Sequence, residues 1–203
     1  MRYQAVIFDL FGTLVDFRTE AEYREAAAKV ARILGAPLND FRKVWVSTLR
    51  DRDRGLFGSL EGDLENAARL LGLQTSVEQI RQAAEVRLKL YHKNLTPRRG
   101  AIETLTALRT SGLKTGLIAG CAWEVPDLWH NTLFVPLIDF AVFSCVAGLS
   151  KPEPRIYKLA CEGLKVPNAP YPYTSRPEAL EWQGPTITSL PELLNLVGHS
   201  RSF

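Results

Sequence analysis

Residues 5–14 read AVIFDLFGTL, and the interpretation of the whole chain starts from this stretch. A short apolar run with little alternation is typical of a buried parallel strand. The run ends at Asp9, and a turn with Gly12 and Thr13 follows. Ligands of open parallel α/β sheets bind at the carboxyl ends of the strands. Asp9 is therefore a candidate nucleophile and the Thr13 hydroxyl a candidate hydrogen-bond partner for a ligand oxygen. The alternative is an Asp that caps the turn after the strand.

Two patterns follow this strand. Residues 17–92 are predicted to be helical, with capping boxes at Thr19–Glu22 and Ser76–Gln79 and further helices at 40–55 and 62–72. From residue 100 onward strands and helices alternate, which indicates a parallel sheet with right-handed crossovers. The strands are predicted at 3–11, 114–120 and 141–146, and the helices at 101–112, 153–164 and 189–197. The fold class is α/β, with the helical block inserted after the first strand.

Lys151 is the second candidate residue. It lies in GLSKPEPRIY (148–157), directly after the strand predicted at 141–146, and so at the same edge of the sheet as Asp9. A lysine there can stabilise an anionic intermediate beside a carboxylate. The alternative is a solvated surface lysine, which is the usual state of this residue.

Composition excludes several classes of protein. The chain has 203 residues, 46% of them hydrophobic, and a net charge of +3, which fits a globular protein with a sizeable core. The small and dispersed positive charge argues against nucleic-acid binding. No apolar run approaches the roughly 20 residues of a membrane span. Three cysteines without C-x-x-C spacing argue against disulfides or a zinc site, and a cytoplasmic location is expected.

The ordered segments VIFDLFGTL, GLIAGCAWEVPDLW and FSCVAGLSKPEPRIY, with helices between the first two, resemble the haloacid dehalogenase-like (HAD) hydrolase superfamily. The resemblance covers roughly residues 4–166. It implies a Rossmann-like core formed by 1–16 and 93–203, and a helical-bundle cap formed by 17–92. It also implies a small-molecule substrate, phosphorylated or halogenated.

The same resemblance implies roles for individual residues. Asp9 matches the nucleophile, Thr13 the residue that orients it, and Lys151 the lysine that holds the nucleophile and the substrate anion. Tyr157 matches a position often occupied by tyrosine in dehalogenase-like members, and is a candidate substrate contact. Mg²⁺ is the implied cofactor, bound by Asp9 and the Phe11 backbone carbonyl.

Phe11 and the segment after the second strand depart from the family pattern. Phosphatases of the superfamily carry a second Asp where this chain has Phe11, and that Asp transfers a proton, a contribution of roughly 10²–10⁴ in rate. A halide leaves without a proton, so Phe11 favours dehalogenation or no chemistry. The substrate-binding Ser or Thr of the second motif, often followed by Asn, aligns with Ala119 and Gly120, so a hydroxyl is missing. Cys121 beside them is interpreted as a core residue.

The fourth motif, which carries the metal-binding acids, is also missing. After the helix predicted at 153–164 the chain runs into a segment, 167–185, that holds five prolines. On the order of 30 residues of the strand–helix–strand unit are lacking, which would leave the first strand at a sheet edge. Glu178 and Glu181 have no spacing that places them at the site. Mg²⁺ binding is therefore in doubt.

Two functions follow from the sequence. The first is a hydrolase that uses Asp9, Thr13 and Lys151, and the second is a catalytically inactive relative that acts as a binding or interaction module. Arg50, Arg52 and Arg54 either meet an anionic substrate from the cap or, more commonly for such mixed charges, form a solvated helix face. The sequence leaves the oligomeric state open.

Overall fold

A three-stranded parallel sheet forms the centre of the molecule. The computed structural model describes residues 3–167 and 187–198, so most of the proline-rich segment, with Glu178 and Glu181, lies outside the described residues. The strands β1 (Ala5–Phe8), β2 (Lys114–Ala119) and β3 (Phe140–Phe143) pair in the order β1-β2-β3. The expected parallel α/β architecture is confirmed. Within the described ranges β1 pairs on one side only, with β2.

The first and third strands are shorter than predicted: of the predicted run 3–11, only Ala5–Phe8 form β1. The run 141–146 was expected to be extended, but β3 ends at Phe143 and Ser144–Ala147 form the short helix α8. The Ser144 hydroxyl is buried and bonds to both backbone groups of Cys121, so it joins the loop after β2 to the end of β3. Side-chain bonds of this kind compete with a strand ladder, which explains why the strand ends here.

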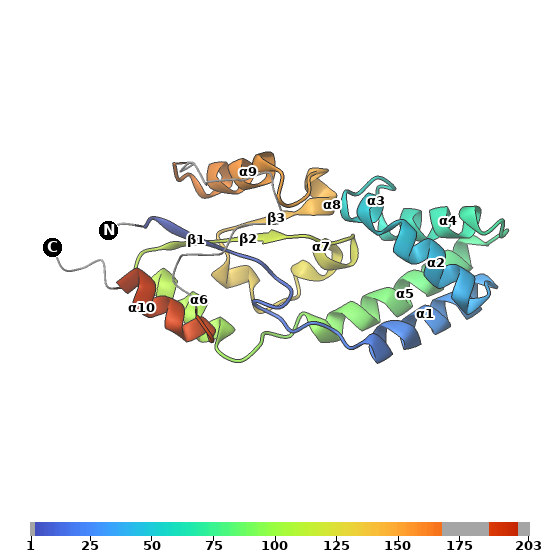
Figure 1. Ribbon diagram of the computed structural model, residues 1–203, viewed down its shortest axis with the longest axis horizontal. Coiled ribbons are helices and arrows are strands. Elements are labelled where there is room, and N and C mark those ends of the chain that lie inside the picture. Colours follow the sequence, from blue (N-terminus) through green and yellow to red (C-terminus); the bar gives the residue numbers. More distant parts are fainter. Residues whose placement is uncertain (1–2, 168–186, 199–203) are drawn as a thin grey trace, which may run out of the picture.

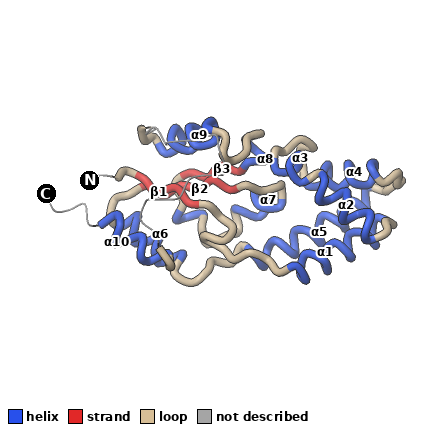
Figure 2. Tube along the Cα trace, in the orientation of Figure 1, coloured by secondary structure: helices blue, strands red, loops and turns tan. Residues whose placement is uncertain are grey.

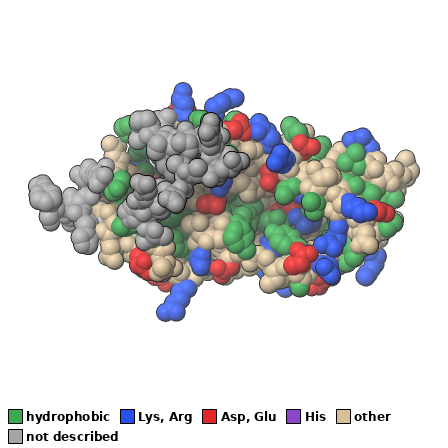
Figure 3. Space-filling model, viewed as in Figure 1, with side chains coloured by type: hydrophobic (Ala, Val, Ile, Leu, Met, Phe, Trp, Pro, Cys, Tyr) green, Lys and Arg blue, Asp and Glu red, His purple; other side chains and the backbone are tan. Residues whose placement is uncertain are grey.

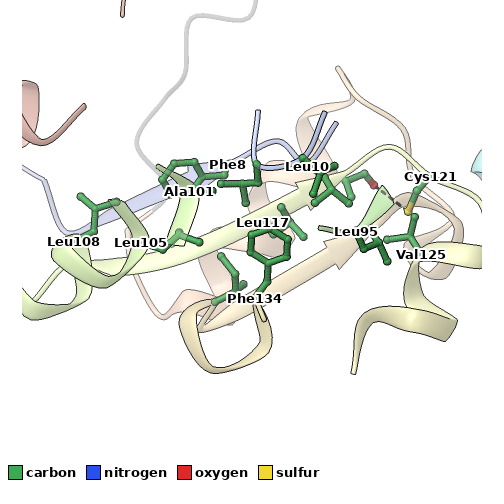
Figure 4. Close-up of a cluster of buried hydrophobic side chains, with 14 of the residues drawn as sticks. Phe8, Leu10, Leu95, Ala101, Leu105, Leu108, Leu117, Cys121, Val125 and Phe134 are labelled. Carbon is green, nitrogen blue, oxygen red and sulfur yellow. Dashed lines mark hydrogen bonds between the residues drawn. The ribbon is translucent and has the colours of Figure 1, made fainter. Parts of the chain in front are cut away.

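Helices cover both faces of the sheet (Figure 1). Helix α9 (Pro154–Leu164) lies on one face, and α6 (Ala101–Thr110) with α10 (Leu193–Gly198) lies on the other. The 3-10 turn η2 (Leu190–Glu192) directly precedes α10. The helices predicted at 101–112, 153–164 and 189–197 are thus confirmed. On the α6 face the buried side chains of Phe8, Leu105, Leu108, Leu117 and Phe134 form one apolar cluster (Figure 4). This packing holds the strands in register and thereby fixes where their ends lie.

The helical insertion lies at the end of the molecule away from the two termini (Figures 1 and 2). Its last helix runs to Asn94, two residues beyond the predicted boundary at 92. Its helices are α1 (Glu20–Leu34), α2 (Leu38–Ser47), α3 (Leu49–Asp53), α4 (Leu60–Leu70) and α5 (Val77–Asn94). Both predicted capping boxes are present, at the starts of α1 and α5. The insertion has an apolar cluster of its own, built around Val30, Phe41, Leu64 and Ile80.

One predicted helix of the insertion is interrupted. Residues 40–55 were expected to form a single helix, but α2 ends at Ser47 and α3 starts at Leu49. The Thr48 hydroxyl donates a hydrogen bond to the Val44 carbonyl at 3.0 Å, a back-bond that commonly bends helices. As a result α3 turns toward α8 at the sheet (Figure 1).

Two short helical segments after β2 were not predicted: α7 (Glu124–Trp129) and the 3-10 turn η1 (Val135–Leu137). Helix α7 packs against α5 and so joins the insertion to the sheet. Among the described helices none is long and apolar enough to cross a membrane. On the face drawn in Figure 3, basic and acidic side chains are interspersed.

Candidate active site

Asp9 lies at the carboxyl end of β1, on the turn that follows the strand. Its neighbours Phe8 and Leu10 are buried, whereas 46% of the Asp9 side chain is exposed. The Leu10 amide donates a hydrogen bond to Asp9 Oδ1 at 2.8 Å, and Gly12 adopts a positive φ of 76° that closes the turn. The strand therefore holds the backbone of Asp9 while its carboxylate faces solvent.

Lys151 reaches Asp9 across 142 residues of sequence. Its Nζ lies 2.5 Å from Asp9 Oδ1, and it also donates to the Ile118 carbonyl of β2 at 3.3 Å. The two residues predicted from separate motifs are thus brought together at the sheet edge. Asp9 Oδ1 accepts both hydrogen bonds, and no donor within 3–167 or 187–198 bonds to Oδ2.

Three other predicted site residues, Gly120, Thr13 and Ala119, differ in how close they lie to the Asp9–Lys151 pair. A Cβ added at Gly120 would lie 3.6 Å from Lys151 Cε, an ordinary contact, so Gly120 borders the pair. Thr13 is half-buried on the Asp9 turn, and its backbone amide donates to the Leu10 carbonyl. Ala119 is fully buried and pairs with Phe143, so its side chain packs in the core.

Two predicted aromatic contacts pack against apolar clusters. The Phe11 ring meets Tyr91 of α5 edge-on, with 6.4 Å between the ring centroids. Tyr157 packs on the α9 side of the sheet, in the cluster of Ile118, Val142 and Ile156. A phenylalanine side chain has no group that transfers a proton, so Phe11 contributes packing only. Tyr157 lies on the opposite face of the sheet from the α6 cluster.

Ser144 is a residue of this region that sequence reasoning missed. Its hydroxyl accepts from the Cys121 amide at 2.9 Å and donates to the Cys121 carbonyl at 3.1 Å. It thereby fixes the loop that contains Gly120. The signal in the sequence was one polar residue inside the apolar run AVFSCV. Cys121 itself is buried, and burial raises the pKa of its thiol, so its interpretation as a core residue is confirmed.

The insertion touches the sheet through a tip contact, in which Arg54 and Gly55 meet residues 145–153. Helix α3 ends in a Schellman motif: the Leu56 amide donates to the Asp51 carbonyl and the Gly55 amide to the Arg52 carbonyl. Gly55 has a φ of 69°, and a Cβ there would lie 1.9 Å from the Cys145 carbonyl oxygen. Only glycine permits both the conformation and the close approach.

Arg54 completes the tip contact. Its guanidinium bonds to Glu153 at 2.5 Å and to the Gly148 carbonyl at 3.1 Å. The Ser150 amide, followed by Arg54, lowers the pKa of the Glu153 carboxyl. These bonds fix the loop that leads into Lys151. The three arginines therefore do not form one solvated face: Arg50 is exposed, Arg54 is bonded to the core, and Arg52 is buried.

Arg52 shows why the solvated-face interpretation was wrong. The break at Thr48 turns α3 so that the Arg52 guanidinium stacks on the Trp45 ring at 3.7 Å and donates to the Trp45 carbonyl at 2.7 Å. Burial lowers its pKa. The packed aromatic surface and the carbonyl replace water around this arginine.

A second contact between insertion and sheet is the buried junction, formed by Arg18, Arg87, Tyr91 and Glu124. Arg87 of α5 donates two hydrogen bonds to Glu124 of α7, at 2.8 and 2.6 Å. Arg18 stacks on the Tyr91 ring at 4.0 Å, and its two Nη atoms are buried without a hydrogen-bond partner. Nothing in the sequence pairs Arg87 with Glu124, because the two lie 37 residues apart.

The residues at this site do not fit a Mg²⁺ ion. Such an ion requires near-octahedral coordination by several oxygen atoms, commonly from more than one carboxylate or from a substrate phosphate. Asp9 Oδ1 accepts hydrogen bonds from Lys151 and the Leu10 amide, so Oδ2 is the one oxygen of this carboxylate left for a metal. In the part of the chain that the structure describes, no group of three or more His, Cys, Asp or Glu side chains is arranged to hold a metal.

Comparisons with known proteins place the chain in a family. A family model described as haloacid dehalogenase-like hydrolase matches residues 3–171. The chain is similar to (S)-2-haloacid dehalogenase 4A of Burkholderia cepacia, with 26% identity over 171 residues that cover 80% of this chain and 70% of the relative. It is also similar to the Rhythmically expressed gene 2 protein of Drosophila melanogaster, with 27% identity over 189 residues that cover 81% and 71% of the two chains.

A solved structure shares the fold. The 2-haloacid dehalogenase from Pseudomonas syringae pv. Tomato DC3000 aligns with a TM-score of 0.59 at 24% sequence identity, over 81% of this chain and 74% of that chain. This likeness agrees with the parallel sheet predicted from the alternating pattern and with the Rossmann-like core that the family resemblance implied. Since the family model spans most of the sequence, the chain belongs to the haloacid dehalogenase-like hydrolases.

Proposed function

We propose that the protein is a hydrolase of small 2-haloacids, which uses Asp9 as a nucleophile and releases halide. The observation that carries this proposal is the Asp9–Lys151 pair at the sheet edge, with Oδ2 of Asp9 unbonded within the described residues. The aspartate offers an unbonded carboxylate oxygen, and Phe11 supplies no acid beside it. In this proposal residues 17–92 act as a cap over the site.

The first step is a displacement at carbon. Asp9 Oδ2 attacks the carbon that bears the halogen, the carbon–halogen bond breaks, and the halide leaves with the bonding electron pair. An ester then joins Asp9 to the substrate carbon. Lys151 holds Oδ1, so the carboxylate cannot rotate away from the attack direction, and its charge stabilises anions next to Asp9.

The second step is hydrolysis of that ester. Water attacks the Asp9 acyl carbon, the acyl–oxygen bond breaks, and a 2-hydroxy acid leaves. The attacking water loses one proton and the departing oxygen gains one. Aspartate is restored with one oxygen atom derived from water. The Thr13 hydroxyl, on the same turn, is proposed to orient Asp9 during this exchange.

Phe11 is the reason to prefer halides to phosphomonoesters. An alkoxide leaving group needs a proton in the transition state, and general acid catalysis supplies roughly 10²–10⁴ in rate. A halide needs none. The relatives include (S)-2-haloacid dehalogenases, which supports the same substrate class.

Halide release from a panel of 2-haloacids, with a parallel panel of phosphomonoesters, tests the proposal. Replacement of Asp9 by Asn should lower turnover at least about 10³-fold, because it removes the nucleophile. Asp40→Asn, which changes an exposed acid on α2, serves as the control and should leave turnover unchanged. A single turnover in ¹⁸O-water should place label in the peptide that contains Asp9. Equal halide release by wild type and Asp9→Asn would reject the nucleophile.

A binding module without turnover is the second candidate. The observation in its favour is the loop after β2, where Ala119 and Gly120 offer no hydroxyl to a substrate. Loss of one such donor can cost about 3 kcal/mol of transition-state stabilisation. Calorimetry with (S)-2-chloropropionate and with phosphate distinguishes the candidates: saturable binding that depends on Asp9, with no product formed over hours, supports the module.

A further inference from the structure

We propose that Arg18 binds the carboxylate group of the substrate, with its two Nη atoms donating to the two carboxylate oxygens. This inference rests on the proposed function and names the part of the 2-haloacid that the protein recognises. In such an acid the carboxylate carbon is bonded directly to the carbon that bears the halogen. An anchor for the carboxylate therefore restrains the carbon that Asp9 attacks.

Arg18 lies on the short segment that joins the Asp9 turn to helix α1, between the sheet and the insertion (Figure 1). The backbone of this segment is tied to the turn, because the Gly12 amide donates to the Val15 carbonyl at 2.8 Å. Arg18 follows Val15 by three residues, a chain length that spans at most roughly 11 Å. The backbone of Arg18 thus stays close to the turn that carries Asp9.

The Arg18 side chain shares an aromatic neighbour with that turn. Its guanidinium stacks on the Tyr91 ring at 4.0 Å, and the Phe11 ring meets the same Tyr91 ring edge-on, with 6.4 Å between the centroids. A second ring, Tyr23 of α1, lies over the guanidinium at 5.7 Å. Tyr23 is exposed, so rotation of this side chain gives a ligand access to Arg18.

The terminal nitrogens of Arg18 lack an acceptor. Only 8% of the residue is exposed, and within the described ranges neither Nη1 nor Nη2 has a hydrogen-bond partner. Nε differs, because the Asn94 side-chain oxygen accepts from it at 2.6 Å when the amide is turned to satisfy both groups. Burial lowers the pKa of Arg18, but an arginine stays charged at neutral pH. A buried cation without an acceptor is costly, and an anionic ligand removes that cost.

The acids near Arg18 do not supply the acceptor. Glu22 is exposed and bonded to Thr19 in the capping box of α1. Glu124 is bonded to Arg87 through Oε1, and its Oε2 is buried without a partner in the described part of the chain. The buried junction thus holds two arginines and one carboxylate. This excess of positive charge favours an anion between the insertion and the Asp9 turn.

The pair of free nitrogens indicates the class of anion. Nη1 and Nη2 belong to one planar group and can donate two parallel N–H bonds, which match the two oxygens of a carboxylate. A halide ion is a single acceptor, and an uncharged amide offers one oxygen and no charge. Arg18 therefore fits the acid group of a 2-haloacid better than it fits the released halide.

Binding of unreactive probes tests the assignment without turnover. Propionate and propionamide share the carbon skeleton of a 2-halopropionate, and only propionate carries the charge. Calorimetry should show saturable propionate binding by wild type that weakens about 100-fold in Arg18→Met, because two charge-assisted hydrogen bonds are lost. Arg24→Met, which changes an exposed arginine of α1, is the matched control and should bind as wild type does. Equal propionate affinity in Arg18→Met, or wild-type affinity for propionamide or chloride as high as for propionate, overturns the assignment.

Thermal unfolding separates recognition from a structural role. Without ligand, Arg18→Met should unfold at the wild-type temperature or above it, because the variant removes an unpaired buried cation. Propionate should raise the Tm of wild type and not that of the variant. Arg18→Lys, which keeps the charge but not the planar group, should recover only part of the affinity. An equal rise of Tm in wild type, Arg18→Met and Arg18→Lys overturns the assignment.

Kinetics with (S)-2-chloropropionate connect this site to the proposed function. Arg18→Met should raise KM for the acid roughly 100-fold and leave KM for 2-chloropropionamide unchanged, so the preference for the acid over the amide is lost. An unchanged preference in Arg18→Met overturns the assignment. Absence of halide release from wild type, with propionate binding that still depends on Arg18, would reject the proposed function and leave the carboxylate site in place.

Discussion

The insertion meets the sheet through two ion pairs of very different burial. At the tip contact the Arg54 and Glu153 side chains are 40% and 35% exposed. At the buried junction Arg87 and Glu124 are 5% and 0% exposed. An exposed pair contributes about 0–1 kcal/mol, whereas removal of one partner of a buried pair costs about 3–5 kcal/mol. The comparison indicates that the junction contributes more than the tip contact to holding the insertion on the sheet.

Removal of one charge at the buried junction should have the largest effect on stability. Arg87→Met should lower the free energy of unfolding by about 3–5 kcal/mol, because Glu124 is left buried and unpaired. Chemical denaturation measures the change. The double variant Arg87→Met/Glu124→Met should recover most of the loss. A single-variant loss below 1 kcal/mol would show that the junction does not anchor the insertion.

The second test addresses the close approach at the tip. Gly55→Ala should cost about 2–4 kcal/mol, since a left-handed φ and a clash with the Cys145 carbonyl both oppose the added Cβ. Gly58→Ala is the control: its φ is also positive, at 78°, but no atom lies within 4 Å of the added Cβ. It should cost about 1–2 kcal/mol. Equal losses in the two variants would mean that the backbones are not in contact at Gly55.

The third test uses Asp63, a buried acid of α4 without hydrogen-bond partners. Burial raises its pKa from 3.8 to about 7, so the folded state binds the proton more tightly than the unfolded chain. Its contribution to stability is therefore full below about pH 4 and falls as the pH rises to about 7. Asp63→Asn should stabilise the protein at pH 8 by about 1–3 kcal/mol and remove this slope. Parallel stability curves for the two proteins from pH 4 to 8 would contradict the assignment.

The smallest effect is expected at the tip ion pair. Arg54→Ala should change the free energy of unfolding by about 0–1 kcal/mol, because both partners are partly solvated. Chemical denaturation measures the change. A stability loss as large as that of Arg87→Met would remove the distinction between the contacts.

The local elements were well predicted where a short-range rule governs them. The capping boxes at Thr19 and Ser76, the strand that leads to Asp9 and the helix that starts at Pro154 were all read from residues within one or two turns. Errors arose where a side-chain hydrogen bond to the backbone, between distant residues at Ser144 and within one turn at Thr48, interrupts the regular pattern. The Ser144 hydroxyl ends β3 early. The break at Thr48 buries Arg52, although the mixed charges around it predicted an exposed side chain.

The candidate site divides in the same way. The order of strands and helices along the chain implies that Asp9 and Lys151 lie at one sheet edge, because the carboxyl ends of parallel strands share that edge. Their 2.5 Å contact bears this expectation out. The absence of an acid at position 11 and of a hydroxyl at 119 and 120 is likewise a fact of the sequence alone.

The contacts between the insertion and the sheet were decided only by the tertiary structure. Arg54 and Gly55 belong to a mixed-charge run that is typical of an exposed surface, and Arg87 and Glu124 have no local reason to pair. Their positions depend on how α3 turns after Thr48 and on how α5 packs against α7. Sequence patterns carry short-range preferences, whereas the burial that pairs Arg87 with Glu124 comes from residues distant along the chain.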